Sequence, residues 1–202
     1  MTISLDNRPE LVEPAARIIL GAIDLGDGGT EKQRHLLQSI VSKVWERPDL
    51  DISDLADLPP GTLGREYFDF YCRNSFELPG EGHGSPSFFV RHDMCHIIAG
   101  SGPTSPEELA LSAFHVGMND NEINWNFLII SLAALELGLF NSDSFEGKSD
   151  ILDRDGALEL MVEGFVRGSH CTGDFSEMDH LADAHCAVEE IRERFGVPAR
   201  QL

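Results

Sequence analysis

The sequence predicts an all-α protein, a single compact domain of about seven or eight helices that spans residues 1–202. Three observations favour this fold class. Apolar residues recur at helical spacing in most long segments, no segment shows the alternation typical of a half-buried strand, and stretches rich in Gly and Pro separate the helical segments. With 202 residues, 42% of them apolar, the chain can bury a core without disulfides or a structural metal.

The first quarter of the chain predicts two helices and a loop. Residues 10–25 have a helical pattern, and residues 30–45 place the capping box of Thr30 and Gln33 ahead of an apolar stripe. Residues 49–61 are rich in acids and contain two adjacent prolines, which is typical of a loop.

The middle of the chain predicts three further helices. Residues 61–75 form a helix rich in aromatic side chains, and the Gly and Pro of residues 78–86 indicate a loop after it. Residues 88–99 contain two histidines at helical spacing, and the glycines that follow should end this helix. Residues 105–118 form the third helix, with Pro106 at its first position, where proline is well tolerated.

The last third of the chain predicts three more helices. Residues 119–139 contain the most apolar run, and residues 156–169 carry apolar side chains on one face. Residues 176–195 are expected to form one continuous helix. His185 lies on the apolar stripe of this helix, so we expect a core histidine there.

The composition excludes several classes of function. The net charge of −20 argues against nucleic-acid binding and against electrostatic docking on anionic lipid. The first residues lack the pattern of a signal peptide, and the longest apolar run ends at Glu136, far short of the ~20 residues of a membrane span. We therefore expect a cytoplasmic protein without a transmembrane segment. Its four cysteines are expected to be reduced thiols: Cys72, Cys95, Cys171 and Cys186.

The sharpest local feature is His92-Asp93-Met94-Cys95-His96. Residues four apart lie on one face of a helix, so the two imidazoles can bind one metal ion, although surface or core histidines also occur at this spacing. Asp93 lies about 100° further around the axis, where it can be a third ligand or can fix a histidine tautomer. These ligand types suit zinc, iron or manganese and do not choose among them.

Other metal-site patterns fit this segment less well. A zinc-protease helix needs a glutamate where this chain has Asp93. A His-Asp phosphohydrolase needs an earlier histidine and a later aspartate, for which only His83 and Asp120 can be named. A di-iron bundle needs two E-x-x-H motifs, and only the segment from Glu177 to His180 fits one.

Glu108 has two interpretations. A short turn after His96 would bring the next helix back, so that Glu108 joins His92 and His96 as a further ligand. Alternatively, Ser105 and Glu108 form a capping box at the start of that helix. The two interpretations differ in geometry, because a capping glutamate bends back to its own backbone and a ligand points at the imidazoles.

His92-Asp93-x-x-His96, then eleven residues, then Glu108 resembles the H-D-x-x-H-x11-E signature of the Coq4-like ubiquinone-biosynthesis family. The likeness extends loosely over residues 30–198. Further similar segments are residues 58–67 (P-x-G-T-x-G-x-x-Y within them), Val90-Arg91, residues 164–168 and residues 191–198.

The resemblance implies an all-helical protein that self-associates and lies peripherally at the inner face of the cell membrane, with other quinone-biosynthesis proteins as partners. It implies that His92, Asp93, His96 and Glu108 are catalytic and bind a divalent metal, zinc before iron or manganese. The implied reaction is an oxidative decarboxylation, in which a hydroxyl replaces the ring carboxyl of a polyprenylated intermediate derived from hydroxybenzoate.

Two alternatives stay open beside this reaction. The chain can be a non-catalytic scaffold that binds isoprenoid lipid, or a metal enzyme of another aromatic-acid pathway. A polyprenyl substrate needs a groove lined by apolar and aromatic side chains. The same side chains are also typical of an ordinary protein core. The candidate substrate-binding residues are Tyr67, Phe70, Tyr71, Arg91, Phe114 and His115.

Overall fold

The structure is a computed structural model that describes residues 52–76, 78, 87–136, 150–154 and 156–200. Within these ranges every element is helical, apart from one isolated antiparallel bridge between Thr62 and Ala187. The all-α class is therefore confirmed. The α-helices are α3 (Leu63–Asn74), α4 (Ser87–Ala99), α5 (Ser105–Met118), α6 (Glu122–Glu136), α7 (Ala157–Ser169) and α8 (Val188–Phe195). Short 3-10 helices are η1 (Ile52–Asp57), η2 (Ile151–Asp153) and η3 (Phe175–Glu177).

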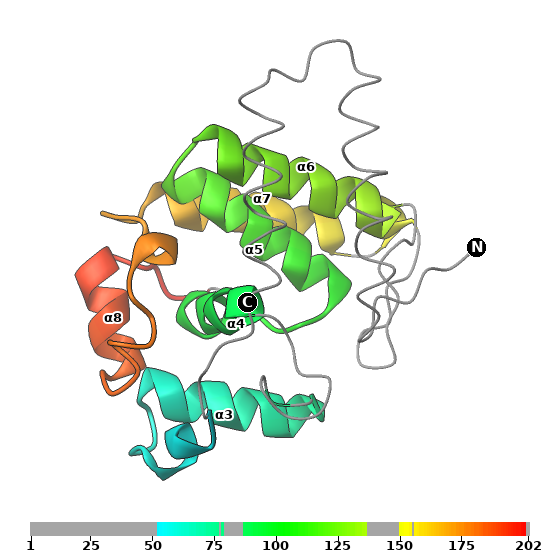
Figure 1. Cartoon of the computed structure of the whole chain (residues 1–202). Helices are drawn as coiled ribbons and strands as arrows, with labels where there is room; N and C mark the ends of the chain where they lie inside the picture. The colour runs from blue at the N-terminus through cyan, green and yellow to red at the C-terminus, as the bar shows by residue number, and fades with distance from the viewer. Residues whose placement is uncertain (1–51, 77, 79–86, 137–149, 155, 201–202) are drawn as a thin grey trace, which may run out of the picture.

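Helix α4 lies at the centre of the described fold (Figure 1). It contacts α3 on one side and α5 on the other, and it also contacts α8 and η3. Its buried apolar side chains point in several directions, as expected for a helix enclosed by neighbours. These side chains belong to Val90, Met94, Cys95, Ile98 and Ala99. The helix that carries both motif histidines is thus held from several directions.

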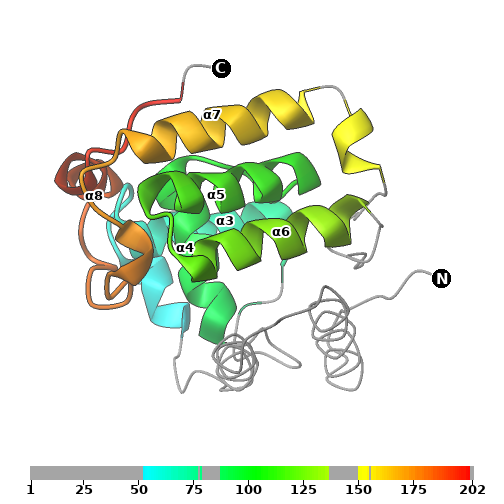
Figure 2. The same cartoon turned by 90° about the horizontal axis from the view of Figure 1, so that it is seen from above.

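Helices α5, α6 and α7 form a layer on one side of α4, and α5 lies between the other two (Figure 2). Glycines allow α5 and α7 to approach until their backbones touch. A Cβ atom on Gly164 would lie 2.2 Å from the carbonyl oxygen of Ala110, and one on Gly168 would lie 2.1 Å from that of Phe114. The spacing of these two helices therefore depends on residues that lack a side chain.

Five helices expected from the sequence are present, with ends that shift by up to three residues: α3, α4, α5, α6 and α7. The loop expected at 49–61 is wrong in part, because η1 forms there. Ile52 and Leu55 bury their side chains in the same core cluster as residues of α3, which stabilises this short helical turn. Residues 10–25, 30–45 and 79–86 lie outside the described residues.

The continuous helix expected at 176–195 is also wrong, because only its last part forms α8. The carbonyls of Ala184 and Cys186 accept hydrogen bonds from the amides of Gly64 and Leu63, at 2.8 and 2.9 Å. The backbone before α8 therefore satisfies the free amides at the start of α3 instead of continuing a helix of its own.

This change moves the histidines of the segment. His185 is exposed rather than part of the core, whereas His180 is buried. The side chain of Asp179 accepts a hydrogen bond from the amide of Ala182 at 3.1 Å, a local turn that competes with helix formation. None of the helices in the described ranges has the length and apolar character needed to span a bilayer.

The contact between α5 and α7 can be tested with Gly168→Ala. The added methyl group would collide with the backbone of α5, so we expect the free energy of unfolding to fall by about 1–3 kcal/mol. Urea denaturation measures this change. The control is Val162→Ala on the exposed face of α7, which should change stability by no more than about 0.5 kcal/mol. An unfolding midpoint of Gly168→Ala equal to the wild type would contradict the close packing.

Candidate metal centre

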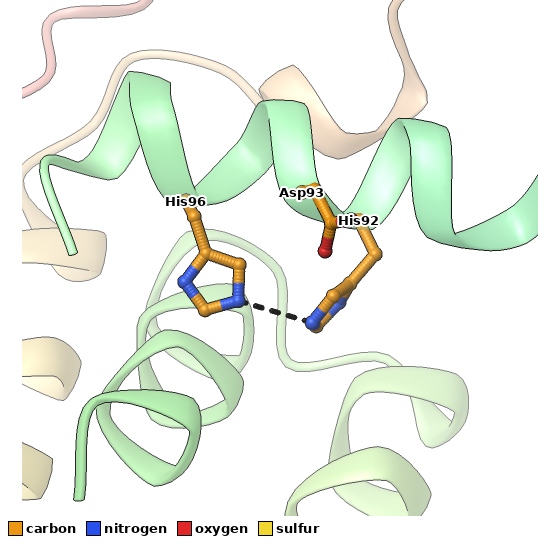
Figure 3. A group of neighbouring side chains, drawn as sticks. All are labelled: His92, Asp93 and His96. Carbon is orange, nitrogen blue, oxygen red and sulfur yellow. Dashed lines mark hydrogen bonds between the residues drawn. The ribbon is translucent and has the colours of Figure 1, made fainter. Parts of the chain in front are cut away.

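His92 and His96 project from the same side of α4, together with Asp93 (Figure 3). The spacing of four residues places the two imidazoles one turn apart, with ring centroids separated by 4.8 Å. The Nε2 atoms of the two rings lie 3.1 Å from each other. His96 is fully buried and His92 is about one-fifth exposed, so the pair has an inner and an outer member.

Glu108 reaches the same point from α5. Its Oε2 atom lies 3.1 Å from Nε2 of His92, and its Oε1 atom lies 3.1 Å from Nε2 of His96. The carboxylate therefore points at the imidazoles, as the ligand interpretation requires. The structure brings together the two histidines and the glutamate that the sequence motif singled out.

The alternative interpretation, a capping box of Ser105 and Glu108, does not hold. Thr104 is the N-cap residue of α5, and its backbone carbonyl accepts the amides of Glu107 and Glu108 at 2.9 and 2.8 Å. Because α5 begins without help from the Glu108 side chain, the Glu108 carboxylate is available to face α4.

Neighbouring groups fix the orientation of His96. Its Nδ1 atom lies 3.1 Å from the hydroxyl oxygen of Ser101, so an Nδ1–H donor leaves the Nε2 lone pair facing His92 and Glu108. The ring of Phe70 lies nearly parallel to the imidazole, with centroids 6.0 Å apart. The amide of Ser101 also donates to the carbonyl of His96 at 2.9 Å, which ties this residue to the end of α4.

Asp93 receives a hydrogen bond from the hydroxyl group of Tyr71 on α3. Asp93, His92 and His96 each offer a ligand atom, and these atoms lie within 4.8 Å of one another. Asp93 is thus positioned either to join the ligands or to support them through its contact with Tyr71, the two roles that the sequence left open. Burial raises the pKa of Asp93 more than the nearby histidines lower it.

The electrostatics of the cluster favour a positive charge between its members. Burial acts to raise the pKa of Glu108, but the His96 and His92 imidazoles outweigh it and hold that pKa well below its usual range. For His92, burial acts to lower the pKa, yet the Glu108 carboxylate raises it overall. Glu108 is therefore ionised, and its negative charge favours a positive charge on or between the neighbouring imidazoles.

The donor set fits a divalent metal. The two imidazole nitrogens lie 3.1 Å from each other, and each lies 3.1 Å from a different oxygen of the Glu108 carboxylate. Ligand atoms about 2.0–2.1 Å from a zinc ion are about 3–3.4 Å from each other, so the spacing agrees with a shared ion. Facing nitrogen lone pairs repel unless a proton or a metal ion lies between them.

The aromatic residues proposed to bind substrate come from two places. Tyr67, Phe70 and Tyr71 are buried on α3 beside the cluster, and the Tyr67 and Tyr71 ring centroids are 4.7 Å apart. Phe114 lies in the core, 5.6 Å from the ring centroid of Phe175. His115 also packs against Phe175, with ring centroids 6.0 Å apart.

Arg91 contacts the segment that begins at η3. Its guanidinium lies 3.4 and 3.5 Å from the carbonyl oxygens of Ser176 and Met178. It lines a pocket of about 300 Å³ together with Glu177, Met178, Asp179, His180 and Leu181. The part of Arg91 in substrate binding stays a prediction.

Sequence reasoning missed Ser101 and the role of Tyr71. Ser101 lies in the turn after α4, and only its position within hydrogen-bond distance of His96 reveals a role. Tyr71 entered as an aromatic substrate contact, whereas its hydroxyl group binds Asp93. The sequence signal for both is weak, because neither residue lies at a spacing typical of a metal site.

Comparison with known proteins adds a likeness in fold. The chain is similar to the crystal structure of a protein from Nostoc punctiforme PCC 73102, provisionally named a ubiquinone biosynthesis protein, with a TM-score of 0.54 and 22% sequence identity. The match covers 91% of this chain and 82% of the Nostoc chain. This likeness shows a shared fold. The sequence matches no protein-family model and no curated protein.

Tyr71→Phe should weaken the support of Asp93. The substitution keeps the ring and removes the donor, which takes the Tyr71 hydroxyl from a partly buried carboxylate. We expect a loss of about 1–3 kcal/mol in the free energy of unfolding of the metal-free protein, measured with urea. Wild-type stability in the variant would show that this hydrogen bond is not formed in solution.

His115 predicts a pH dependence of stability. Burial, followed by the positive charge of His92, lowers the pKa of His115 to about 3, and its buried Nε2 atom has no hydrogen-bond partner among the described residues. The unfolded chain takes up a proton near pH 6.5 and the folded chain does not. Stability is therefore lost as the pH falls below 6.5, by up to about 1.4 kcal/mol per pH unit from this group.

The corresponding test compares wild type with His115→Phe, which keeps a ring against Phe175 but does not titrate. Between pH 6.5 and pH 5, urea unfolding of the variant should show a loss of stability smaller by about 1.5–2 kcal/mol. The exposed His185→Ala is the control and should retain the wild-type dependence. Identical pH profiles for wild type and His115→Phe would contradict a His115 that stays neutral in the folded chain.

Proposed function

We propose that this chain binds one divalent metal ion, with zinc as the first candidate and iron or manganese as alternatives. The observation that carries the proposal is the convergence of His92, His96 and Glu108 at 3.1 Å spacing. Asp93 is the fourth member of the proposed set. Two neutral imidazoles and two carboxylates would balance the charge of a divalent ion.

The residues around the proposed site hold its members in place before any ligand arrives. Ser101 orients His96, Tyr71 orients Asp93, and Thr104 starts α5 so that Glu108 faces the histidines. A divalent metal in this position would act as a Lewis acid that polarises a carboxylate or phenolate oxygen. The aromatic rings of α3 supply an apolar wall on one side.

The proposed activity is that of a Coq4-like protein of ubiquinone biosynthesis. Two things support it: the H-D-x-x-H-x11-E motif, which folds into a cluster, and the fold shared with the Nostoc protein. The substrate would be a polyprenylated ring derived from hydroxybenzoate. Its carboxyl group would leave as CO₂ and a hydroxyl group would take its place, with an external oxidant as the source of oxygen.

A non-catalytic scaffold that binds isoprenoid lipid is the second candidate. It is favoured by large apolar side chains that are exposed on α6 and α7. These are Trp125, Ile129, Leu158, Val162 and Val166, each between 43% and 59% exposed. Peripheral contact with the inner face of the cell membrane, self-association and contact with other quinone-biosynthesis proteins belong to the same proposal, because such a surface is typical of interaction sites.

Metal binding is tested by elemental analysis of the purified full chain. Wild type should contain about one zinc per chain, and His96→Ala should contain almost none, because removal of a buried ligand opens the site. His185→Ala is the matched control, since His185 is exposed and distant in sequence from the motif. Equal metal content in wild type and His96→Ala would contradict the site.

Activity is tested by incubating the metal-loaded protein with a polyprenylated 4-hydroxybenzoate and an oxidant, followed by mass spectrometry. An enzyme converts the ring carboxyl to a hydroxyl, and His96→Ala does not. Isoprenoid binding without conversion would support the scaffold. A short ring acid converted as well as the prenylated one would place the enzyme in another aromatic-acid pathway.

A further inference from the structure

The end of α4 is held by arginine side chains that come from the C-terminal part of the chain. The guanidinium of Arg192 donates to the carbonyl oxygens of Ile98 and Ile97 at 2.9 and 2.8 Å. That of Arg167 donates to the carbonyl of Ala99 at 2.7 Å. These carbonyls belong to the last turn of α4, where no further turn of helix supplies amides that would donate to them.

Arg200 makes a contact of a different kind, because it joins two helices. Its Nη1 atom donates to the carbonyl oxygen of Gly100 at 3.1 Å and to Oε1 of Glu107 at 2.6 Å. Gly100 follows α4 directly, and Glu107 lies in the first turn of α5. One guanidinium nitrogen therefore bridges both ends of the connection between the two helices.

This connection determines the geometry of the proposed metal centre. His96 lies four residues before Gly100, and Glu108 directly follows Glu107. A shift of α5 relative to the end of α4 would change the 3.1 Å distance between Nε2 of His96 and Oε1 of Glu108. Arg200 thus holds the two elements that supply the two kinds of ligand.

The bridge is partly shielded from solvent. The side chains of Arg200 and Glu107 are 25% and 19% exposed, less than the exposed pair of Arg194 and Asp183. The hydroxyl of Thr104 also donates to Oε2 of Glu107 at 3.3 Å, which fixes the second oxygen of this carboxylate. A partly buried, hydrogen-bonded ion pair restrains its partners more than a surface pair does.

We propose that Arg200 is a positioning residue for the metal centre, which it serves by bridging Gly100 and Glu107. The inference rests on the metal binding put forward under the proposed function. Arg200 touches neither the ligand atoms nor a substrate in the described structure. It acts through the distance between α4 and α5, and contacts that orient the ligands of a metal site commonly contribute a factor of about 10–100 to metal affinity.

Whether the loss of Arg200 weakens or strengthens metal binding distinguishes a positioning role from a simple effect of its charge. Removal of a positive side chain near a cation site should strengthen cation binding by reducing repulsion. Loss of positioning should weaken it. Arg200→Gln therefore gives opposite results under the two explanations, whereas a substitution of Glu107 would confuse them.

The experiment measures zinc affinity of the full chain by competition with a chromophoric chelator, for wild type, Arg200→Gln and Arg200→Lys. Arg194→Gln is the matched control, because this arginine comes from the same part of the chain and pairs with Asp183 rather than with the described residues of α4. We expect Arg200→Gln to bind zinc roughly tenfold more weakly. Arg200→Lys should recover part of the loss, and Arg194→Gln should equal wild type.

A second measurement excludes a purely structural role. The visible absorption of bound Co²⁺ reports ligand geometry, so it should change in Arg200→Gln even under conditions in which circular dichroism shows a fully folded chain. Wild-type affinity and an unchanged Co²⁺ spectrum in Arg200→Gln would overturn the inference and leave the proposed function intact. A wild-type chain that binds neither ion would instead overturn the proposed function, and the inference with it.

Discussion

The described structure depends on one interaction, the meeting of two imidazole nitrogens with one carboxylate between α4 and α5. Nitrogen lone pairs at 3.1 Å from each other are unfavourable unless a positive charge lies between them. The depressed pKa of Glu108 and the raised pKa of His92 have the same cause, the attraction between the carboxylate and a positive charge at the imidazoles. A proton supplies this positive charge to one pair of atoms, whereas a divalent ion would supply it to both imidazoles and the carboxylate at once.

The rest of the fold serves to hold these three groups. Helix α4 is enclosed by neighbours, so its two histidines have little freedom to turn away. Thr104 rather than Ser105 is the N-cap of α5, so the Glu108 carboxylate is not needed to cap the helix and faces the histidines of α4. Gly100, with a φ of 71°, allows the chain to leave α4 and return at once, a backbone conformation that glycine adopts at low cost.

The sequence predicted the helical class because α3, α7 and α8 show a strong apolar period, and it predicted the histidine pair because helical spacing is regular. It did not predict the irregular chain before α8, because those carbonyls serve the start of α3, a partner far away in sequence. The hydrogen bond from Tyr71 to Asp93 likewise joins residues that are distant in sequence, whereas the contact between Ser101 and His96 depends on the conformation of the turn after α4. The sequence left two interpretations of Glu108, and the structure excludes the capping box because the N-cap of α5 is Thr104 rather than Ser105.

The most direct test of the account is a crystal structure of the zinc-loaded chain with anomalous data at the zinc absorption edge. The account predicts a single strong peak about 2.1 Å from Nε2 of His92, Nε2 of His96 and a carboxylate oxygen of Glu108. A crystal that contains zinc but shows no peak between these three side chains, with Glu108 bound directly to the imidazoles instead, would contradict it.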